Sequence, residues 1–349
     1  MTSLVSFGFV ANFIHSQFKP LALPSTKYTG QTIIVTGSNA GLGLQSARHF
    51  ARLDAGKVIL AVRSRRKGEL AATSIEQSTG CRPGVVEVWD LDLSSYASIQ
   101  AFADRAARTL DRIDVLVNNA GIVTYEFALV EGTEMTIAVN VVGPLFLSVL
   151  LLPKMRETSL RFNKACVVTF VGSFVHFMTT FPERKARNIL EQLASRERAD
   201  MKDRYNVSKL IQLLLARELA SQISTTRSES QSDVDADSAK RKPGTIIINV
   251  VNPGFVKTEI MRSAGGVLFR LFFAPLRAIL ARSAEVGSRT ILHGAAGGRE
   301  THGQYLSDCA VTEPSGFVTS AEGVEVQKKL WKEVGEVLER VRPGVMQNV

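Results

Sequence analysis

Tyr205 and Lys209 stand four residues apart at the start of a helical run of apolar residues, Leu210 to Ala220. On a helix this spacing places the two side chains on one face, one turn apart. A free tyrosine has a pKa of about 10, and a neighbouring ammonium stabilises the phenolate and brings it closer to neutral working conditions. The pair could therefore exchange a proton with a substrate oxygen. Because Y-x-x-x-K arises often by chance, the surrounding sequence decides how much weight it carries.

A glycine-rich segment near the start of the chain, Thr36 to Gly43 (TGSNAGLG), lies between the β-branched run Thr32 to Val35 and a helical segment. In a strand, turn and helix arrangement, backbone N–H groups and the helix dipole can hold a pyrophosphate. We expect Gly37 to permit the turn, Gly41 the close approach of the phosphates, and Gly43 the packing of helix on strand. The segment predicts a dinucleotide site, with a purely structural turn as the alternative.

The place where such a site selects its cofactor is strongly basic. Dinucleotide enzymes that use NAD usually carry Asp or Glu at the end of the second strand, whereas this chain reads Arg63-Ser64-Arg65-Arg66-Lys67. A guanidinium binds a 2′-phosphate through charge-assisted hydrogen bonds, and a carboxylate would repel it. The segment predicts NADP(H), bound by Arg63 first and Lys67 second. The alternative, a solvated charge at a helix start, suits Arg66 and also fits Arg65.

Apolar runs recur along the chain, with helix-like segments such as Leu44 to Leu53 between them. Apolar strands that alternate with helices imply a parallel sheet buried on both faces. We therefore predict the α/β class, with a single-domain, Rossmann-like, doubly wound parallel sheet flanked by helices on both faces. The six predicted strands are Thr32–Val35, Lys57–Val62, Val85–Leu91, Val115–Asn118, Ala165–Val171 and Thr245–Val251.

The predicted domain organisation has three parts: an N-terminal extension of residues 1–30, a catalytic domain of residues 31–320, and a C-terminal helix and tail of residues 321–349. Two stretches interrupt the alternation. Ser221 to Gly244 is polar and predicts a mobile surface insertion. Residues 259–285 contain the apolar segment Gly265 to Ala281, for which a lid over an apolar substrate pocket and plain core packing both remain open.

Composition limits the remaining classes of function. The 349 residues, 45% hydrophobic and 21% charged, suit one large globular domain. The net charge of +9 would suit an anionic partner, but aromatic residues do not alternate with a basic stripe, so we predict no nucleic-acid partner. The three cysteines, Cys81, Cys166 and Cys309, are far apart and favour a reducing compartment. The five histidines form no H-x-x-x-H pair, which argues against a zinc or iron site.

The first segment, residues 1–19, is apolar, but it lacks the basic leader and cleavage site of a signal peptide, and polar residues interrupt it. Phe7, Val10, Ile14 and Phe18 fall on one helical stripe. We expect a short helix that docks on the body of the protein, with peripheral membrane contact as the alternative. The expected location is the cytoplasm, with membrane association left open.

Four motifs, taken in order, resemble those of the short-chain dehydrogenase/reductase family. They are Thr36–Gly43, Asn118–Gly121 (NNAG), Ser173 after an apolar strand, and Tyr205–Lys209 (YNVSK). The resemblance covers roughly Gln31 to Thr258 and is specific as a set. The whole chain, including the segment Gly303–Asp308, resembles fungal members related to the retinol-dehydrogenase-like branch, many of which act in secondary metabolism.

The resemblance implies a role for each matching residue. Tyr205 would be the general acid or base, Lys209 would lower its pKa and bind the nicotinamide ribose, and Ser173 would bind the substrate oxygen. Asn140 would hold a water next to the lysine in a proton relay, although it could also be an ordinary helix-interior amide. Cofactor contacts are implied for Gly37, Ser38, Asn39, Gly41, Leu42, Gly43, Arg63, Lys67, Asp92, Asn118, Asn119, Tyr205, Lys209, Val256 and Thr258. Of these, Asp92 and Asn119 could instead cap turns.

The chain departs from the family pattern between the serine and the tyrosine. The family separates them by about a dozen residues, whereas Ser173 and Tyr205 are about thirty apart. Phe174 to Arg204 therefore predicts an inserted excursion, with a charged helix from Asn188 to Asp200, that returns to the same helix start.

These features favour an NADP-dependent ketone reductase or alcohol dehydrogenase acting on a lipophilic small molecule, for example a fungal polyketide. The first alternative is a catalytically inactive NADP-binding regulatory protein, and the second is an epimerase or dehydratase of the longer relatives. No residue pattern sets the substrate, the direction of reaction or the oligomeric state.

Overall fold

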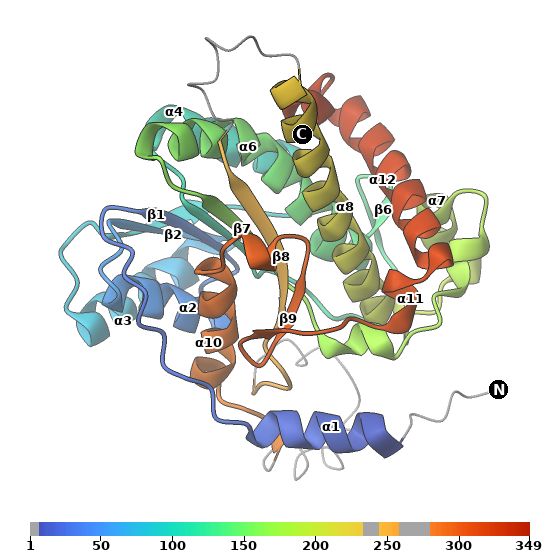
Figure 1. Ribbon diagram of the computed structural model, residues 1–349, viewed down its shortest axis with the longest axis horizontal. Coiled ribbons are helices and arrows are strands. Elements are labelled where there is room, and N and C mark those ends of the chain that lie inside the picture. The colour runs from blue at the N-terminus through green and yellow to red at the C-terminus, as the bar shows by residue number, and fades with distance from the viewer. Residues whose placement is uncertain (1–6, 233–243, 258–279) are drawn as a thin grey trace.

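The computed structural model describes residues 7–232, 244–257 and 280–349, and it contains a central eight-stranded sheet (Figure 1). The strands lie in the order β10-β9-β8-β7-β4-β1-β2-β3, and all neighbours are parallel except β9 and β10. Their bounds are β1 Thr32–Thr36, β2 Lys57–Val62, β3 Val86–Asp90, β4 Val115–Asn118, β7 Cys166–Val171, β8 Ile246–Asn252, β9 Tyr305–Ser307 and β10 Ala310–Val311. The six predicted strands agree with β1, β2, β3, β4, β7 and β8 to within a residue at each end. The predicted doubly wound fold is confirmed.

Helices cover both faces of this sheet (Figure 1). On one face lie α2 (Gly41–Arg52), α3 (Arg65–Thr79) and α10 (Ala284–Ala295). On the other lie α4 (Tyr96–Thr109), α6 (Gly143–Phe162) and α8 (Arg204–Ser232), with α12 (Ala321–Val341) packed outside α8. The shorter elements are α1 Phe7–Phe18, β5 Leu129–Val130, β6 Thr133–Glu134, α5 Met135–Ile137, η1 Ala138–Val142, η2 Phe174–Phe177, η3 Pro182–Lys185, α7 Ile189–Leu193, η4 Arg196–Arg198, η6 Arg299–Thr301, α11 Gly316–Thr319 and η7 Val345–Asn348.

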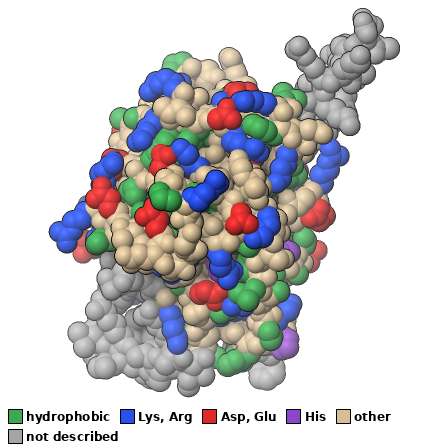
Figure 2. Space-filling view, turned by 90° about the vertical axis from the view of Figure 1, so that its left-hand side faces the viewer, with side chains coloured by type: hydrophobic (Ala, Val, Ile, Leu, Met, Phe, Trp, Pro, Cys, Tyr) green, Lys and Arg blue, Asp and Glu red, His purple; other side chains and the backbone are tan. Residues whose placement is uncertain are grey.

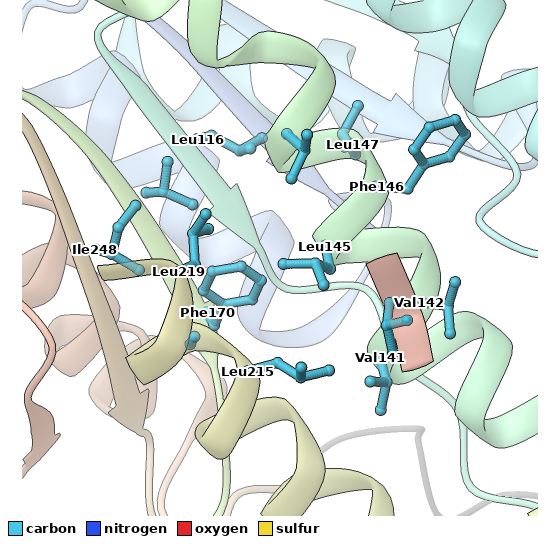
Figure 3. Close-up of a cluster of buried hydrophobic side chains, with 14 of the residues drawn as sticks. Leu116, Val141, Val142, Leu145, Phe146, Leu147, Phe170, Leu215, Leu219 and Ile248 are labelled. Carbon is cyan, nitrogen blue, oxygen red and sulfur yellow. The ribbon is translucent and has the colours of Figure 1, made fainter. Parts of the chain in front are cut away.

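The central strands are mostly apolar because they are buried on both faces. Along β1, Ile33 and Val35 join the hydrophobic cluster under α2, α3 and α10, whereas Ile34 joins the cluster under α4, α6 and α8. This explains why the strand sequences show no alternation of apolar and polar residues. Figure 3 shows the second cluster, in which strand residues Leu116, Phe170 and Ile248 meet helix residues Leu145, Leu147, Leu215 and Leu219.

The strand order reverses direction between β1 and β4, and this reversal positions the site. The chain leaves β1 toward α2 on one face and leaves β4 toward α5, η1 and α6 on the other. In open parallel sheets a crevice forms outside the carboxyl ends of the strands at such a point. The glycine-rich turn, the segment after Asn118 and the turn at Ser173 all follow the carboxyl ends of strands.

Two predictions about insertions need correction. The segment Ser221–Gly244 is not irregular from its start, because α8 continues to Ser232; its residues up to 232 include no glycine or proline that would stop a helix. The single helix predicted from Asn188 to Asp200 is wrong as well. Extended backbone at Ser195, whose hydroxyl bonds the nearby Glu197 carboxylate, separates α7 from the 3-10 turn η4. Of the expected lid, residues 259–285, the part up to residue 279 lies outside the described residues.

Helix α1 lies against the carboxyl-end loops of the sheet (Figure 1). The Gln17 side-chain oxygen accepts a hydrogen bond from the Phe255 N–H at 3.0 Å, and the buried Arg282 guanidinium bonds the Ser16 carbonyl. The predicted docking of this segment is therefore seen. Of the predicted apolar stripe, Ile14 and Phe18 are 40% and 61% exposed.

The most apolar helical stretch belongs to the core. Among the described residues, one stretch, Met135–Phe162, is long and apolar enough to cross a membrane, and 83% of its apolar window is buried inside the protein. On the face shown in Figure 2, Lys and Arg side chains are interspersed with Asp and Glu, so this face offers no continuous basic stripe for a nucleic-acid backbone.

A buried ion cluster joins the excursion after Ser173 to the start of α8. The fully buried Arg204 guanidinium lies 3.6 Å from a Glu134 oxygen and 3.6 Å from a Glu183 oxygen. Glu134 also caps α5, accepting a hydrogen bond from the Thr136 N–H at 2.9 Å. Burial raises the pKa of the Glu183 carboxyl, while the Arg204 charge acts to lower it. The cluster holds the residue directly before Tyr205.

Replacing Arg204 by methionine is expected to destabilise the protein by about 3–5 kcal/mol, because it leaves two buried carboxylates without their cation. Urea unfolding at neutral pH measures this loss. Arg66→Met is the matched control, since that side chain is exposed and its loss is expected to change the free energy of unfolding by no more than about 0.5 kcal/mol. Equal stability of the two variants would contradict a structural role for the cluster.

Candidate active site

The glycine-rich turn after β1 is held by the end of β4. Gly37 has a φ of +64°, which a side chain would strain, and a Cβ on Gly43 would lie 2.5 Å from the Asn119 amide nitrogen. The Asn119 amide donates to the Thr36 carbonyl at 2.8 Å. In return the Thr36 hydroxyl accepts the N–H groups of Asn119 at 3.0 Å and Ala120 at 2.9 Å. Contacts between two motifs that are separate in the sequence, Thr36–Gly43 and Asn118–Gly121, therefore hold the turn in shape.

Several residues predicted to touch a cofactor use their side chains within the protein. The Ser38 hydroxyl is buried and donates to a β1 carbonyl at 2.8 Å, and the buried Asn118 amide donates to the Ser148 hydroxyl of α6 at 2.9 Å. We therefore assign both side chains to holding the turn and α6, which leaves their backbone groups for a ligand. One Asp92 oxygen accepts from the Ser94 N–H at 2.9 Å, so Asp92 does cap a turn. Asn39, Gly41, Leu42 and Val256 are half-buried, and Thr258 lies outside the described residues.

The basic segment after β2 divides into bound and free side chains. Arg65 forms ion pairs with Glu69 at 3.1 Å and Asp90 at 3.4 Å. Arg63 and Lys67 are exposed, and within the described part of the chain neither forms an ion pair or a side-chain hydrogen bond. Arg63 and Lys67 are thus available to an anion, whereas Arg65 is already neutralised.

Ser173 and Tyr205 meet despite the excursion between them. Both are half-buried, and the Ser173 hydroxyl interacts with the Tyr205 phenol. The excursion returns to α8 through a hydrogen bond of 2.5 Å from the Thr179 hydroxyl to the Asp203 carboxylate. Burial raises the pKa of Tyr205 to about 12, and the Ser173 hydroxyl opposes this rise.

Lys209 lies one turn further along α8, as the spacing predicts. Its buried ammonium donates to the Val171 carbonyl at the end of β7 at 2.7 Å and to the Gln212 side-chain oxygen at 3.3 Å. It stands 5.9 Å from the centre of the Tyr205 ring. Burial lowers the pKa of Lys209 to about 8, because the charged form loses hydration.

Asn140 occupies a π-helical turn, η1, close to Lys209. Its side-chain oxygen accepts the Ile122 N–H at 2.8 Å, and its amide donates to the Ile122 carbonyl at 3.0 Å and the Ser208 hydroxyl at 3.1 Å. The Asn140 backbone carbonyl accepts a hydrogen bond from the Gln212 amide at 2.9 Å. Sequence reasoning missed Gln212, although its position three residues after Lys209 places it on the same side of the helix.

His176 is a second residue that the sequence reading missed. Its ring is buried, with Nδ1 2.7 Å from the Ser173 carbonyl and Nε2 3.2 Å from the Ser315 N–H, which donates to it. Nδ1 therefore carries the proton and the ring is neutral. Burial lowers the pKa of His176 to about 4. The ring fixes the turn at Ser173 against the C-terminal part of the chain, a contact between residues far apart in the sequence.

A hydroxyl, a phenol and an ammonium thus lie near the glycine-rich turn. Such a set can bind an oxygen, transfer a proton to it and stabilise its charge. Among the described residues, no group of three or more His, Cys, Asp and Glu side chains could hold a metal ion.

Comparison with known proteins agrees with this geometry. A family model described as short chain dehydrogenase matches residues 31–180. The short chain dehydrogenase/reductase dmxR8 of Cryptosporiopsis sp. is 41% identical, over 96% of this chain and 99% of its own length. The chain belongs to the short-chain dehydrogenase/reductase family. It is accordingly an oxidoreductase acting on CH–OH and C=O groups.

Further fungal relatives of this short-chain dehydrogenase/reductase include the short-chain dehydrogenase anuD of Penicillium roqueforti, 38% identical over 96% of this chain and 84% of its own length. The short chain dehydrogenase atnD of Emericella nidulans is 45% identical over 86% of this chain and 91% of its own length. The predicted family and its fungal members are confirmed, and the retinol-dehydrogenase-like branch stays a prediction.

Solved structures share the fold at low sequence identity. A 3-ketoacyl-(acyl-carrier-protein) reductase from Brucella melitensis complexed with NADH has a TM-score of 0.55 and 18% identity, over 80% of this chain and 97% of its own. An L-sorbose reductase from Gluconobacter frateurii complexed with NADPH and L-sorbose has a TM-score of 0.56 and 18% identity, over 82% of this chain and 98% of its own. At these identities the comparison shows the fold alone.

His176 is expected to make stability fall as the solution is acidified. Its folded pKa, about 4, lies below the ordinary value of 6.5, so the unfolded chain takes up the proton first and stability is lost as pH falls through this window. The loss between pH 7 and pH 5 is about 2 kcal/mol. Urea unfolding measures the free energy of unfolding at both pH values. Between pH 7 and pH 5 this free energy is expected to fall by about 2 kcal/mol less in His176→Gln than in the unmodified protein. His15→Gln, at an exposed position, is expected to behave like the unmodified protein. An unchanged loss in His176→Gln would show that the ring does not stay neutral.

Proposed function

We propose that this protein is an NADP-dependent reductase that interconverts a ketone and a secondary alcohol on a lipophilic small molecule. The observation that carries the proposal is the contact of the Ser173 hydroxyl with the Tyr205 phenol, one helical turn from the Lys209 ammonium. All three groups lie at the carboxyl edge of the sheet, beside the turn after β1. The catalytically inactive alternative would have no physical need for this set of partners.

Proton transfer follows from the positions of these side chains. NADP(H), when bound, supplies or accepts the hydride. In the direction of reduction Tyr205 donates its proton to the substrate oxygen, while the Ser173 hydroxyl donates a hydrogen bond to the charge that develops there. Lys209 stabilises the phenolate that remains on Tyr205. In oxidation the same phenolate takes the proton from the alcohol.

The proposed choice of NADP(H) rests on the segment after β2. Arg63 and Lys67 are exposed and without described partners, whereas a carboxylate that would repel a 2′-phosphate is absent from residues 63–67. The crowded contact of Gly43 with Asn119 and the turn at Gly37 provide a cradle for the pyrophosphate. We also propose five further cofactor contacts: Asn39, Leu42, Asp92, Val256 and Thr258.

The proposed lipophilic substrate is supported by apolar side chains around Ser173. The Phe174 ring stands 4.7 Å from the Phe13 ring of α1, and Phe177 and Met178 are 38% and 52% exposed on the same turn. These side chains and the protein's fungal relatives favour a secondary metabolite, such as a polyketide, as the substrate.

We place the protein in the cytoplasm. Ile14 and Phe18 on the outer side of α1 are the residues through which it would touch a membrane surface.

Arg63→Ala is expected to weaken NADPH binding about 10- to 100-fold, because it removes a charge-assisted hydrogen bond to the 2′-phosphate. NADH lacks that phosphate, so its affinity is expected to stay unchanged. Titration of both cofactors, followed by nicotinamide fluorescence, measures the two affinities. Arg66→Ala removes a neighbouring exposed charge and is expected to leave NADPH binding nearly intact. Equal losses in the two variants, or equal losses for both cofactors, would refute recognition of the phosphate by Arg63.

Tyr205→Phe is expected to lower NADPH oxidation with a panel of lipophilic ketones by at least about 100-fold, because the proton donor is lost while the ring remains. Cofactor affinity is expected to hold. Tyr125→Phe changes an exposed tyrosine and serves as the matched control. Turnover by Tyr205→Phe at the rate of this control would remove the phenol from the mechanism.

A further inference from the structure

Gln212 forms a bridge between Lys209 and Asn140. Its side-chain oxygen accepts from the Lys209 ammonium at 3.3 Å, and its amide nitrogen donates to the Asn140 carbonyl at 2.9 Å. All three side chains are buried: Asn140 is 0%, Gln212 is 3% and Lys209 is 4% exposed. One amide group therefore satisfies both a buried cation and a buried carbonyl.

The Asn140 carbonyl is open to such a donor because of the local sequence. In an α-helix it would accept the N–H of the residue four positions on, but that residue is Pro144, which has none. The chain relaxes here into the π-helical turn η1. The Asn140 side chain bonds Ile122 and Ser208, and its backbone carbonyl accepts from Gln212.

The Lys209 ammonium has three N–H groups to place. One goes to the Val171 carbonyl at 2.7 Å and one to Gln212, so a single donor remains for a ligand or for the neighbouring phenol. Of the groups around Lys209, Tyr205 is the one that titrates; Asn140, Gln212 and the Val171 carbonyl are neutral. No ion pair links Lys209 to an acidic side chain anywhere in the described part of the chain.

We propose that Gln212 is a positioning residue for the reaction, which holds Lys209 charged and aimed at Tyr205 by bridging it to the Asn140 carbonyl. The inference rests on the proposed function, since it takes Lys209 as the cation that serves Tyr205. The family resemblance implies a water between the asparagine and the lysine. Gln212 contacts both of these residues here, and one N–H of the Lys209 ammonium remains beside it.

The test measures the titration of Lys209 itself and needs neither substrate nor turnover. Carbon-13-labelled lysine is introduced into the full chain, and the Lys209 signal is assigned by its absence in Lys209→Met. Gln212→Leu removes the acceptor at nearly the same volume, so the ammonium loses a stabilising hydrogen bond. Its protonation constant is expected to fall about tenfold. Gln212→Glu keeps an acceptor and adds an opposite charge, so the protonation constant is expected to rise instead.

Gln327→Leu is the matched control, because Gln327 is a buried glutamine whose amide bonds Glu218 away from the site. It is expected to leave the Lys209 titration unchanged. Opposite shifts in the two Gln212 variants support the proposal, and if Gln212→Leu does not fold, a rise in Gln212→Glu alone supports it. No shift in Gln212→Glu, or shifts of the same sign in both variants, overturns it. Because catalysis is not measured, this outcome is independent of whether the proposed reaction occurs.

Discussion

Burial of the sheet on both faces is the constraint on which the rest of the structure depends. Since the central strands pack against helices above and below, a polar side chain at an interior position must find a partner inside the protein, as the buried Asn249 amide does with the Gly294 carbonyl. Chemistry is therefore confined to the ends of the strands. The reversal of strand order between β1 and β4 opens one end, and the loops that follow β1, β4, β7 and β8 all supply residues to the same edge.

Burial at this edge sets the protonation states of the two central groups. It raises the pKa of Tyr205 to about 12, which the neighbouring Ser173 hydroxyl opposes, and it lowers the pKa of Lys209 to about 8. The phenol thus carries its proton at neutral pH. That state suits donation to a carbonyl oxygen. Oxidation would require a larger fall in the pKa of Tyr205.

Local patterns in the sequence were enough to predict the strands and the relative positions of residues within one helix. The apolar runs predicted the six central strands, and the four-residue spacing of Tyr205 and Lys209 placed both on one helix face. Contacts between distant residues were not predictable in this way. The bond of His176 to Ser315 depends on how the C-terminal part of the chain packs. The inward turn of the Asn118 side chain depends on α6 lying behind β4.

The residues that we propose to face the substrate belong to segments outside the regular alternation of strands and helices. Phe13 from α1 meets Phe174 from the excursion after β7, while Gln17 and Arg282 bind the loop that follows β8. The excursion also supports Ser173 and Tyr205, because His176 bonds the Ser173 carbonyl and Thr179 bonds the Asp203 carboxylate. Ser173 and Tyr205 can meet despite their long separation in the sequence. The ion pair of Glu183 with Arg204 and the hydrogen bond of Thr179 with Asp203 bring the excursion back to the start of α8.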